Sequence, residues 1–220
     1  MDLQQIETDL QNPDFQYRTK AVSALRNYPP EVAVPILCRH LGDREFLVRS
    51  FIARELGYQK NSESFAALLQ LLEFDNTPNV QAEAANSLSL FGRLAASHLV
   101  KSFLKDDHWL IRRSILAGLV DMECPAELYE ICVEALAGDD LTVMADAIGA
   151  LSHLADSAYR SPALEKILSL QDHEKPYIRI RVAYALKYFD EPSATEALAK
   201  LRQDNDHRVV GATMEDLLPD

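Results

Sequence analysis

The sequence has little glycine and few cysteines. Seven glycines among 220 residues form neither a glycine-rich phosphate loop nor a strained turn around a catalytic serine, which excludes these two catalytic motifs. The three cysteines, Cys38, Cys124 and Cys132, are an odd set without metal-ligand spacing. We expect Cys38 and Cys132 to be buried on helices as small apolar residues, and a reducing cytoplasm fits this usage best.

An excess of positive charge and long hydrophobic runs are also missing. There are 22 basic and 34 acidic residues, for a formal net charge of −12. A nucleic-acid groove needs a basic surface that neutralises phosphates, so this balance argues against nucleic acid and disfavours anionic membranes. No stretch approaches the length of a membrane span, and residues 1–5 do not resemble a secretory signal. We therefore expect a soluble, cytoplasmic chain whose partners are proteins or small molecules, with no membrane insertion.

What the sequence does contain is a repeat. Seven times an apolar residue is followed eight positions later by leucine, and successive pairs are 31, 32, 31, 32, 35 and 31 residues apart. The pairs are Tyr17/Leu25, Val48/Leu56, Val80/Leu88, Ile111/Leu119, Val143/Leu151, Ile178/Leu186 and Val209/Leu217. Eight residues is close to two helical turns, so both members of a pair lie on one helix face. A second amphipathic segment precedes each pair, and no alternating run predicts strands.

This period predicts an all-α fold, an α-solenoid of about seven helical hairpins in a single domain over residues 1–220. The predicted repeats are 1–28, 29–60, 61–93, 94–123, 124–157, 158–190 and 191–220. The outer faces of a repeat array lack a neighbour, so we expect Leu217 and Leu218 to be partly uncovered and open to a partner or a second copy.

A short polar residue stands about five positions before each apolar anchor, and an arginine directly follows four of the anchors. The polar residues are Asn12, Asp43, Asp75, Asp106 and Asp204, with Asp139 and Asp172 displaced by one position. The arginines are Arg18, Arg49, Arg112 and Arg179. An Asp or Asn turn followed by Val-Arg resembles the HEAT repeat, and in that family the arginine and the aspartate form a ladder between adjacent repeats. We therefore interpret these arginines as structural, and we expect the ladder to be broken at Gln81, Met144 and Val210.

One enzyme class built from HEAT-like hairpins binds two irons through repeated His-Glu dyads. This chain has a single dyad, His173-Glu174, in a predicted loop before Pro176. A lone dyad cannot build that site, so no metal centre is expected.

Residues three, six and ten positions after each anchor should point away from the apolar stripe of the second helices. They include Lys20, Phe51, Arg54, Tyr58, Glu83, Asn86, Asp146, His153, Arg181, Tyr184 and Tyr188. An arginine flanked by tyrosines, as in the sixth unit, suits a flat, carboxylate-bearing ligand or a protein hot spot; the ordinary alternative is a solvated helix face. Trp109, the only tryptophan, stands beside Arg112 and Arg113, and by itself is expected to cover a helix turn.

A narrower resemblance covers the fourth and fifth units. Residues 106–119, which read Asp-Asp-His-Trp-Leu-Ile-Arg-Arg-Ser-Ile-Leu-Ala-Gly-Leu, and residues 127–130, Glu-Leu-Tyr-Glu, are similar to the cyanobacterial HEAT-like proteins of the phycobilin lyase and phycobilisome degradation group. This resemblance implies a protein that engages phycobiliproteins and their linear tetrapyrrole, the bilin. It would attach the bilin, remove it or help dismantle the antenna. Other short HEAT-like proteins act as assembly adaptors.

The resemblance leads to a hypothesis for the binding site. A bilin carries two propionates and four pyrrole nitrogens, so Arg113 and Arg181 would pair with propionates while Asp146 or Glu83 accepts pyrrole N–H bonds. The aromatic rings of Trp109, Tyr184 and Tyr188 would stack on the pigment. No catalytic residue and no resident cofactor is assigned. The alternative is a non-catalytic adaptor whose tyrosine-rich sixth unit anchors another protein and whose acidic rim steers a basic partner.

Overall fold

The computed structural model describes residues 1–215, and all regular secondary structure in this range is helical. The first eight helices are α1 (Leu3–Leu10), α2 (Phe15–Ala24), α3 (Pro30–Arg39), α4 (Phe46–Gln59), α5 (Ser62–Phe74), α6 (Pro78–Ser89), α7 (Arg93–Lys105) and α8 (Trp109–Asp121). The remaining six are α9 (Pro125–Ala137), α10 (Leu141–Ser152), α11 (Arg160–Leu168), α12 (Pro176–Leu186), α13 (Pro192–Leu201) and α14 (His207–Met214). A 3₁₀ turn, η1 (Leu25–Asn27), follows α2. Each odd-numbered helix forms a hairpin with the next even-numbered one, which confirms the predicted all-α class.

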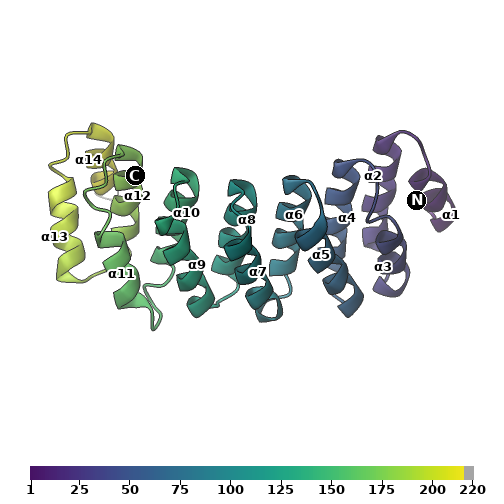
Figure 1. The fold of residues 1–220 in the computed structure, drawn as a ribbon, viewed down its shortest axis with the longest axis horizontal. Helices are drawn as coiled ribbons and strands as arrows, with labels where there is room; N and C mark the ends of the chain where they lie inside the picture. Colours follow the sequence, from purple (N-terminus) through teal and green to yellow (C-terminus); the bar gives the residue numbers. More distant parts are fainter. Residues whose placement is uncertain (216–220) are drawn as a thin grey trace. The chain divides into compact units, whose positions relative to one another are not determined.

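The helices form two compact units. The first is Met1–Met122 with α1 to α8, and the second begins at Glu123 and contains α9 to α14. Within the first unit the hairpins lie side by side, with α2, α4, α6 and α8 packed in sequence and α3, α5 and α7 in a second row (Figure 1). Within the second unit α10, α12 and α14 pack in sequence, and α11 contacts α13. Each unit is thus a stack of helical hairpins, the arrangement that defines an α-solenoid.

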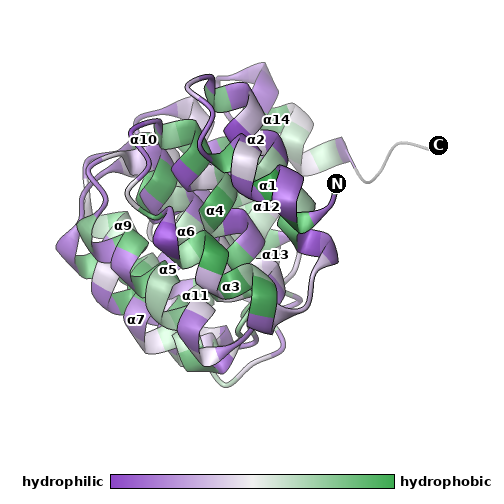
Figure 2. Cartoon of the chain, turned by 90° about the vertical axis from the view of Figure 1, so that its right-hand side faces the viewer, coloured by the Kyte–Doolittle hydropathy of each residue, from purple (hydrophilic) through white to green (hydrophobic). Residues whose placement is uncertain are grey.

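The repeating leucines form the apolar core of the two units. Leu25, Leu56, Leu88, Leu119, Leu151 and Leu186 are all fully buried, and Leu217 lies outside the described residues. Hydrophobic and hydrophilic residues alternate around the individual helices, as amphipathic packing requires (Figure 2). One anchor was predicted wrongly, because Tyr17 is 47% exposed. Arg18 is buried instead, and Tyr17 turns to the surface, where the amine of Lys20 lies 5.7 Å from its ring centroid.

The turn aspartates connect neighbouring hairpins, as Asp43 illustrates. Its Oδ1 accepts the backbone N–H of Glu45 two residues on (2.9 Å), which holds the turn between α3 and α4. Its carboxylate also accepts Nε and Nη2 of Arg18 at 2.8 and 3.0 Å, and Arg18 donates Nη1 to the carbonyl of Asn12 in its own turn. The arginine therefore joins two successive turns. The amide that Asp43 accepts belongs to Glu45, the N-cap residue of α4.

The same connection recurs in both units. Arg49 binds Asp75 with a shortest distance of 2.6 Å, and Arg179 binds Asp204 at 2.6 Å. In the third repeat Gln81 instead donates its side-chain amide to the carbonyl of Leu72 (3.1 Å). The predicted ladder is thus confirmed at these arginines and is interrupted at Gln81.

Candidate binding surfaces

The sixth hairpin carries aromatic and basic side chains on α12 and in the turn that follows it. We call this set the α12 strip: Tyr177, Arg181 and Tyr184 on the helix, and Tyr188 two residues after its end. The spacing of four and three residues places Tyr177, Arg181 and Tyr184 on one side of the helix, opposite its buried face. The three rings are 44%, 36% and 66% exposed. Tyrosine combines a large apolar ring with a polar hydroxyl and is enriched at protein interfaces.

Arg181 is the cation at the centre of the α12 strip. Its guanidinium carbon lies 5.6 Å from the ring centroid of Tyr177, within cation–π range. Its Nε is buried and donates to no atom of residues 1–215. Further along the helix the amine of Lys187 lies 5.3 Å from the ring centroid of Tyr184. No acidic residue occurs between Lys175 and Phe189. The strip is therefore a local basic and aromatic surface on a chain of net negative charge.

A second aromatic and basic surface lies in the first unit, on α4 and the turn after α2. Arg26 donates Nε and Nη2 to the carboxylate of Glu55 at 2.8 and 2.9 Å, and its guanidinium carbon lies 3.9 Å from the ring centroid of Tyr58. Arg54 lies over Phe51 at 4.2 Å, and its Nε is 3.7 Å from Glu55. Two stacked guanidinium groups thus flank one fully buried carboxylate. The periodicity placed Arg54 and Tyr58 on the presented face, but it gave no signal for the pairing of Arg26 with Glu55.

Glu83 on α6 lies close enough to this surface for the charges of Arg54 and Glu55 to act on its carboxyl. Burial raises the pKa of its carboxyl; Arg54 opposes this effect and Glu55 adds to it, so the pKa stays above its ordinary value. A carboxyl with a raised pKa ionises less readily and can act as a hydrogen-bond donor over a wider pH range.

Trp109 and Arg113 lie at the start of α8. The indole is 45% exposed and stacks on His108 with a centroid distance of 6.0 Å. The Arg113 guanidinium carbon is 5.7 Å from the indole centroid. Trp109 therefore covers one side of the helix start and leaves its other side accessible.

The seven residues predicted for one site are divided between the two units. Glu83, Trp109 and Arg113 belong to the first unit, and Asp146, Arg181, Tyr184 and Tyr188 belong to the second. In the second unit, Arg181 and Tyr184 lie together on α12, while Asp146 is half-buried on the neighbouring α10.

Within residues 1–215, no three His, Cys, Asp or Glu side chains gather in a way that could hold a metal ion. Within the same range, no helix has the length and apolar character needed to cross a membrane.

The stacked hairpins and their Asp–Arg pairs define the class of protein, an all-α stack of helical hairpins. Residues 41–120 match the family described as HEAT repeats. No curated protein sequence gives a significant match.

Solved structures share the same architecture. The Escherichia coli protein YibA is 15% identical, with a TM-score of 0.68, over 100% of this chain and 88% of that chain. The complex of CpcE and CpcF of phycocyanin lyase from Nostoc sp. PCC7120 gives 21% identity and a TM-score of 0.54, over 97% of this chain and 93% of that one. Kap95p, solved with RanGDP, gives 14% identity and a TM-score of 0.63, over 96% of this chain but only 34% of its own length. At such identities the likeness concerns the fold.

Proposed function

We propose that this chain is a protein-interaction platform and that the α12 strip is its principal contact surface for a partner. The observation that carries this proposal is the set of three exposed tyrosines near Arg181, two on one side of α12 and the third in the turn after it. Tyrosine and arginine are the residues most enriched at interface hot spots, because they combine large apolar area with directional hydrogen bonds. The proposed place of action is the cytoplasm, where Cys38, Cys124 and Cys132 would persist as thiols.

The proposed partners are phycobiliproteins, in phycobilisome degradation or in attachment or detachment of the chromophore. The likeness of fold to the CpcE and CpcF subunits of phycocyanin lyase supports this choice of client. If the bilin itself is bound, Arg113 and Arg181 are the proposed propionate ligands, Glu83 or Asp146 accepts pyrrole N–H groups, and Trp109 and the strip tyrosines stack on the pigment.

Binding of the client is tested with purified phycocyanin subunits and the full chain. Arg181→Ala and Tyr188→Ala should each weaken binding about ten-fold, the usual effect of truncating a hot-spot residue. Arg202→Ala, which removes an exposed arginine just after α13, serves as the control and should leave binding unchanged. Equal affinity of all these proteins for phycocyanin would overturn the assignment of the α12 strip.

Binding of the pigment is tested separately by titrating a free bilin and recording its absorption spectrum. A saturable spectral shift that Arg181→Ala or Arg113→Ala removes supports a bilin site in the corresponding unit. No shift, combined with loss of phycocyanin binding in Arg181→Ala, indicates a non-catalytic adaptor. Release of pigment from isolated phycocyanin would instead indicate an enzyme.

A further inference from the structure

In three repeats an arginine binds the aspartate in the turn of the next repeat. The third repeat has no such arginine. Gln81 occupies the position of Arg18, Arg49 and Arg179, and its amide bonds the carbonyl of Leu72. Asp106 stands where Asp43, Asp75 and Asp204 receive their arginines. Its Oδ1 accepts the backbone N–H of His108 (2.8 Å), and it forms no ion pair with any residue in the range 1–215. A carboxylate that is neutralised in other repeats is therefore left without its guanidinium.

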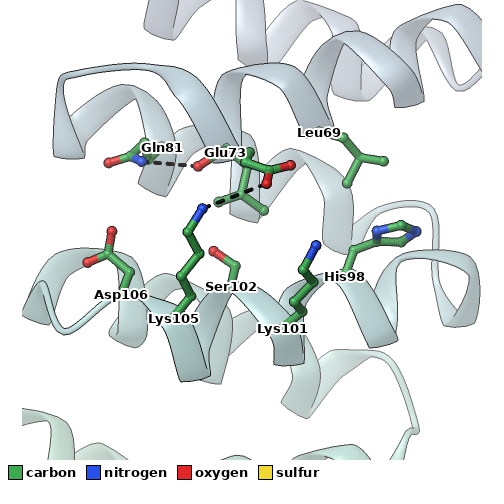
Figure 3. Close-up of a pocket in the computed structure, with 9 residues that line it drawn as sticks. Leu69, Glu73, Gln81, His98, Lys101, Ser102, Lys105 and Asp106 are labelled. Atoms are coloured by element: carbon green, nitrogen blue, oxygen red, sulfur yellow. Dashed lines mark hydrogen bonds and ion pairs between the residues drawn. The ribbon is translucent and has the colours of Figure 1, made fainter.

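A cavity lies beside Gln81 and Asp106. It holds about 100 Å³ between α5 and α7, several times the roughly 10–15 Å³ that one water needs. Gln81 and Asp106 lie at one end of it, and Lys101 and His98 lie at the other (Figure 3). In the corresponding depressions of two other repeats, Arg49 or Arg179 forms part of the wall.

The lysines of the cavity do not replace the missing arginine. Lys105 directs its amine to Glu73, with Nζ 3.7 Å from Oε1, as Figure 3 shows. Lys101 projects from α7 near His98, away from Asp106 (Figure 3). At this end of the cavity the guanidinium of Arg112 donates Nε to the backbone carbonyl of Asp106 (2.7 Å). The carboxylate of Asp106 forms no ion pair within residues 1–215 and lies beside the Gln81 amide.

We propose that this cavity binds the guanidinium group of an arginine supplied by a partner protein, which completes the interrupted ladder from outside. The three intact pairs show the geometry that the partner's arginine would adopt, with Nε and Nη2 on the two carboxylate oxygens at 2.6 to 3.0 Å. The net charge of −12 favours the approach of a basic segment. This site is separate from the α12 strip and does not depend on which client that strip binds.

The test uses the full chain and N-acetyl-arginine amide as the probe, followed by NMR. The backbone N–H of His108, which bonds Asp106, and the side-chain amide of Gln81 should shift in a saturable way. The neutral isostere N-acetyl-citrulline amide should produce no comparable shift. Asp106→Asn should weaken binding about ten-fold or more, because it removes a charged hydrogen-bond acceptor. Asp107→Asn, the same charge change one residue further on, should leave binding intact.

A second variant, Gln81→Arg, supplies the guanidinium within the chain. It should abolish binding of the probe while the thermal midpoint of unfolding stays equal or rises. The proposal is overturned if citrulline amide titrates like arginine amide, if Asp106→Asn and Asp107→Asn behave alike, or if folded Gln81→Arg still binds the probe.

Discussion

At the scale of single residues, the buried carboxylate of Glu55 is the charged group that most requires a partner. Removing an ionised carboxylate from water costs several kcal/mol unless it is paired and hydrogen-bonded. Arg26 supplies two hydrogen bonds, and its guanidinium stays partly solvated, with 45% of the side chain exposed. Tyr58 then covers the guanidinium. The three residues therefore depend on one another, which makes Arg26 a stability determinant although it lies at the surface.

We expect Arg26→Ala to lower the free energy of unfolding by about 2 kcal/mol, because it leaves Glu55 buried with only the longer contact to Arg54. Urea unfolding followed by circular dichroism measures the effect. Adding Glu55→Gln to the same protein should recover part of the loss, since it removes the uncompensated charge. Arg39→Ala, at an exposed position of α3, should change stability by less than about 0.5 kcal/mol. If both arginine variants unfold at the same urea concentration, the pairing does not contribute.

The ladder carboxylates should make stability depend on acid pH. The hydrogen bonds from Arg179 hold the pKa of Asp204 below its ordinary value, against the effect of burial. A carboxyl whose pKa is lower in the folded chain stabilises the fold only while it is ionised. This stabilisation is therefore present at neutral pH and is lost as the pH falls below the ordinary carboxyl pKa of about 4.

Accordingly, Asp204→Asn should unfold at a lower temperature than the unmodified chain at pH 7, and the difference should shrink as the pH falls toward about 2. Differential scanning calorimetry at several pH values measures this. Asp172→Asn, whose partner Lys200 is exposed, provides the control and should have little effect at any pH. A difference that stays constant with pH would show that ionisation of Asp204 is not responsible.

At the scale of the helices, close packing between α4 and α6 depends on a glycine. A Cβ atom at Gly57 would lie 2.7 Å from the Cβ of Ser87, closer than real Cβ contacts come. Glycine within a helix costs about 1 kcal/mol relative to alanine. Its presence in α4 is explained by this approach, which lets the second helices of adjacent hairpins pack tightly.

We therefore expect Gly57→Ala to destabilise the fold by about 1 to 3 kcal/mol, because the steric clash exceeds the gain in helix propensity. Gly149→Ala on α10 is the matched comparison, since nothing lies within 4 Å of a Cβ there. That variant should gain about 0.5 to 1 kcal/mol. Chemical denaturation of both proteins measures the two values, and a gain in stability for Gly57→Ala would contradict the proposed close approach.

At the scale of the whole molecule, the chain consists of two compact units that divide after Met122. In a stack of hairpins each repeat contacts chiefly its neighbours, so a group of complete repeats keeps most of the contacts that stabilise it. The sequence predicted a single domain over residues 1–220. Whether residues 1–122 fold without the rest of the chain tests that prediction.

A fragment of residues 1–122 should fold independently, because it contains four complete hairpins and two intact Arg–Asp pairs. We expect a helical circular dichroism spectrum and a single cooperative urea transition. Arg49→Ala should lower its free energy of unfolding by about 3 kcal/mol, since it leaves the buried Asp75 without its cation. A fragment without a cooperative transition would show that residues beyond 122 are needed for folding.

The candidate surfaces could be predicted from the sequence only in part. The spacing after Ile178 predicted that Tyr184 and Tyr188 are exposed, and both are, although Tyr188 lies in the turn after α12 and not on the helix. The pairing of Arg26 with Glu55 was not predictable, because 29 residues separate them and Arg26 lies outside the repeat positions. The cavity beside Asp106 was also missed, because its lining comes from α5, the start of α6 and α7 together.

The sequence alone determined the class of fold and the identity of most core positions, because helix periodicity and the interval between repeats are local properties of the chain. It also predicted that Arg18, Arg49 and Arg179 join adjacent turns, since these repeats present the same residues at the same place. Arg112, predicted for the same role, donates Nε to the carbonyl of Asp106 in its own turn. Only the tertiary structure decided which side chains become neighbours across hairpins, as with Glu55 and the Asp106 cavity. Those neighbours depend on the distance and rotation between packed helices, and side-chain volume and charge pairing set both.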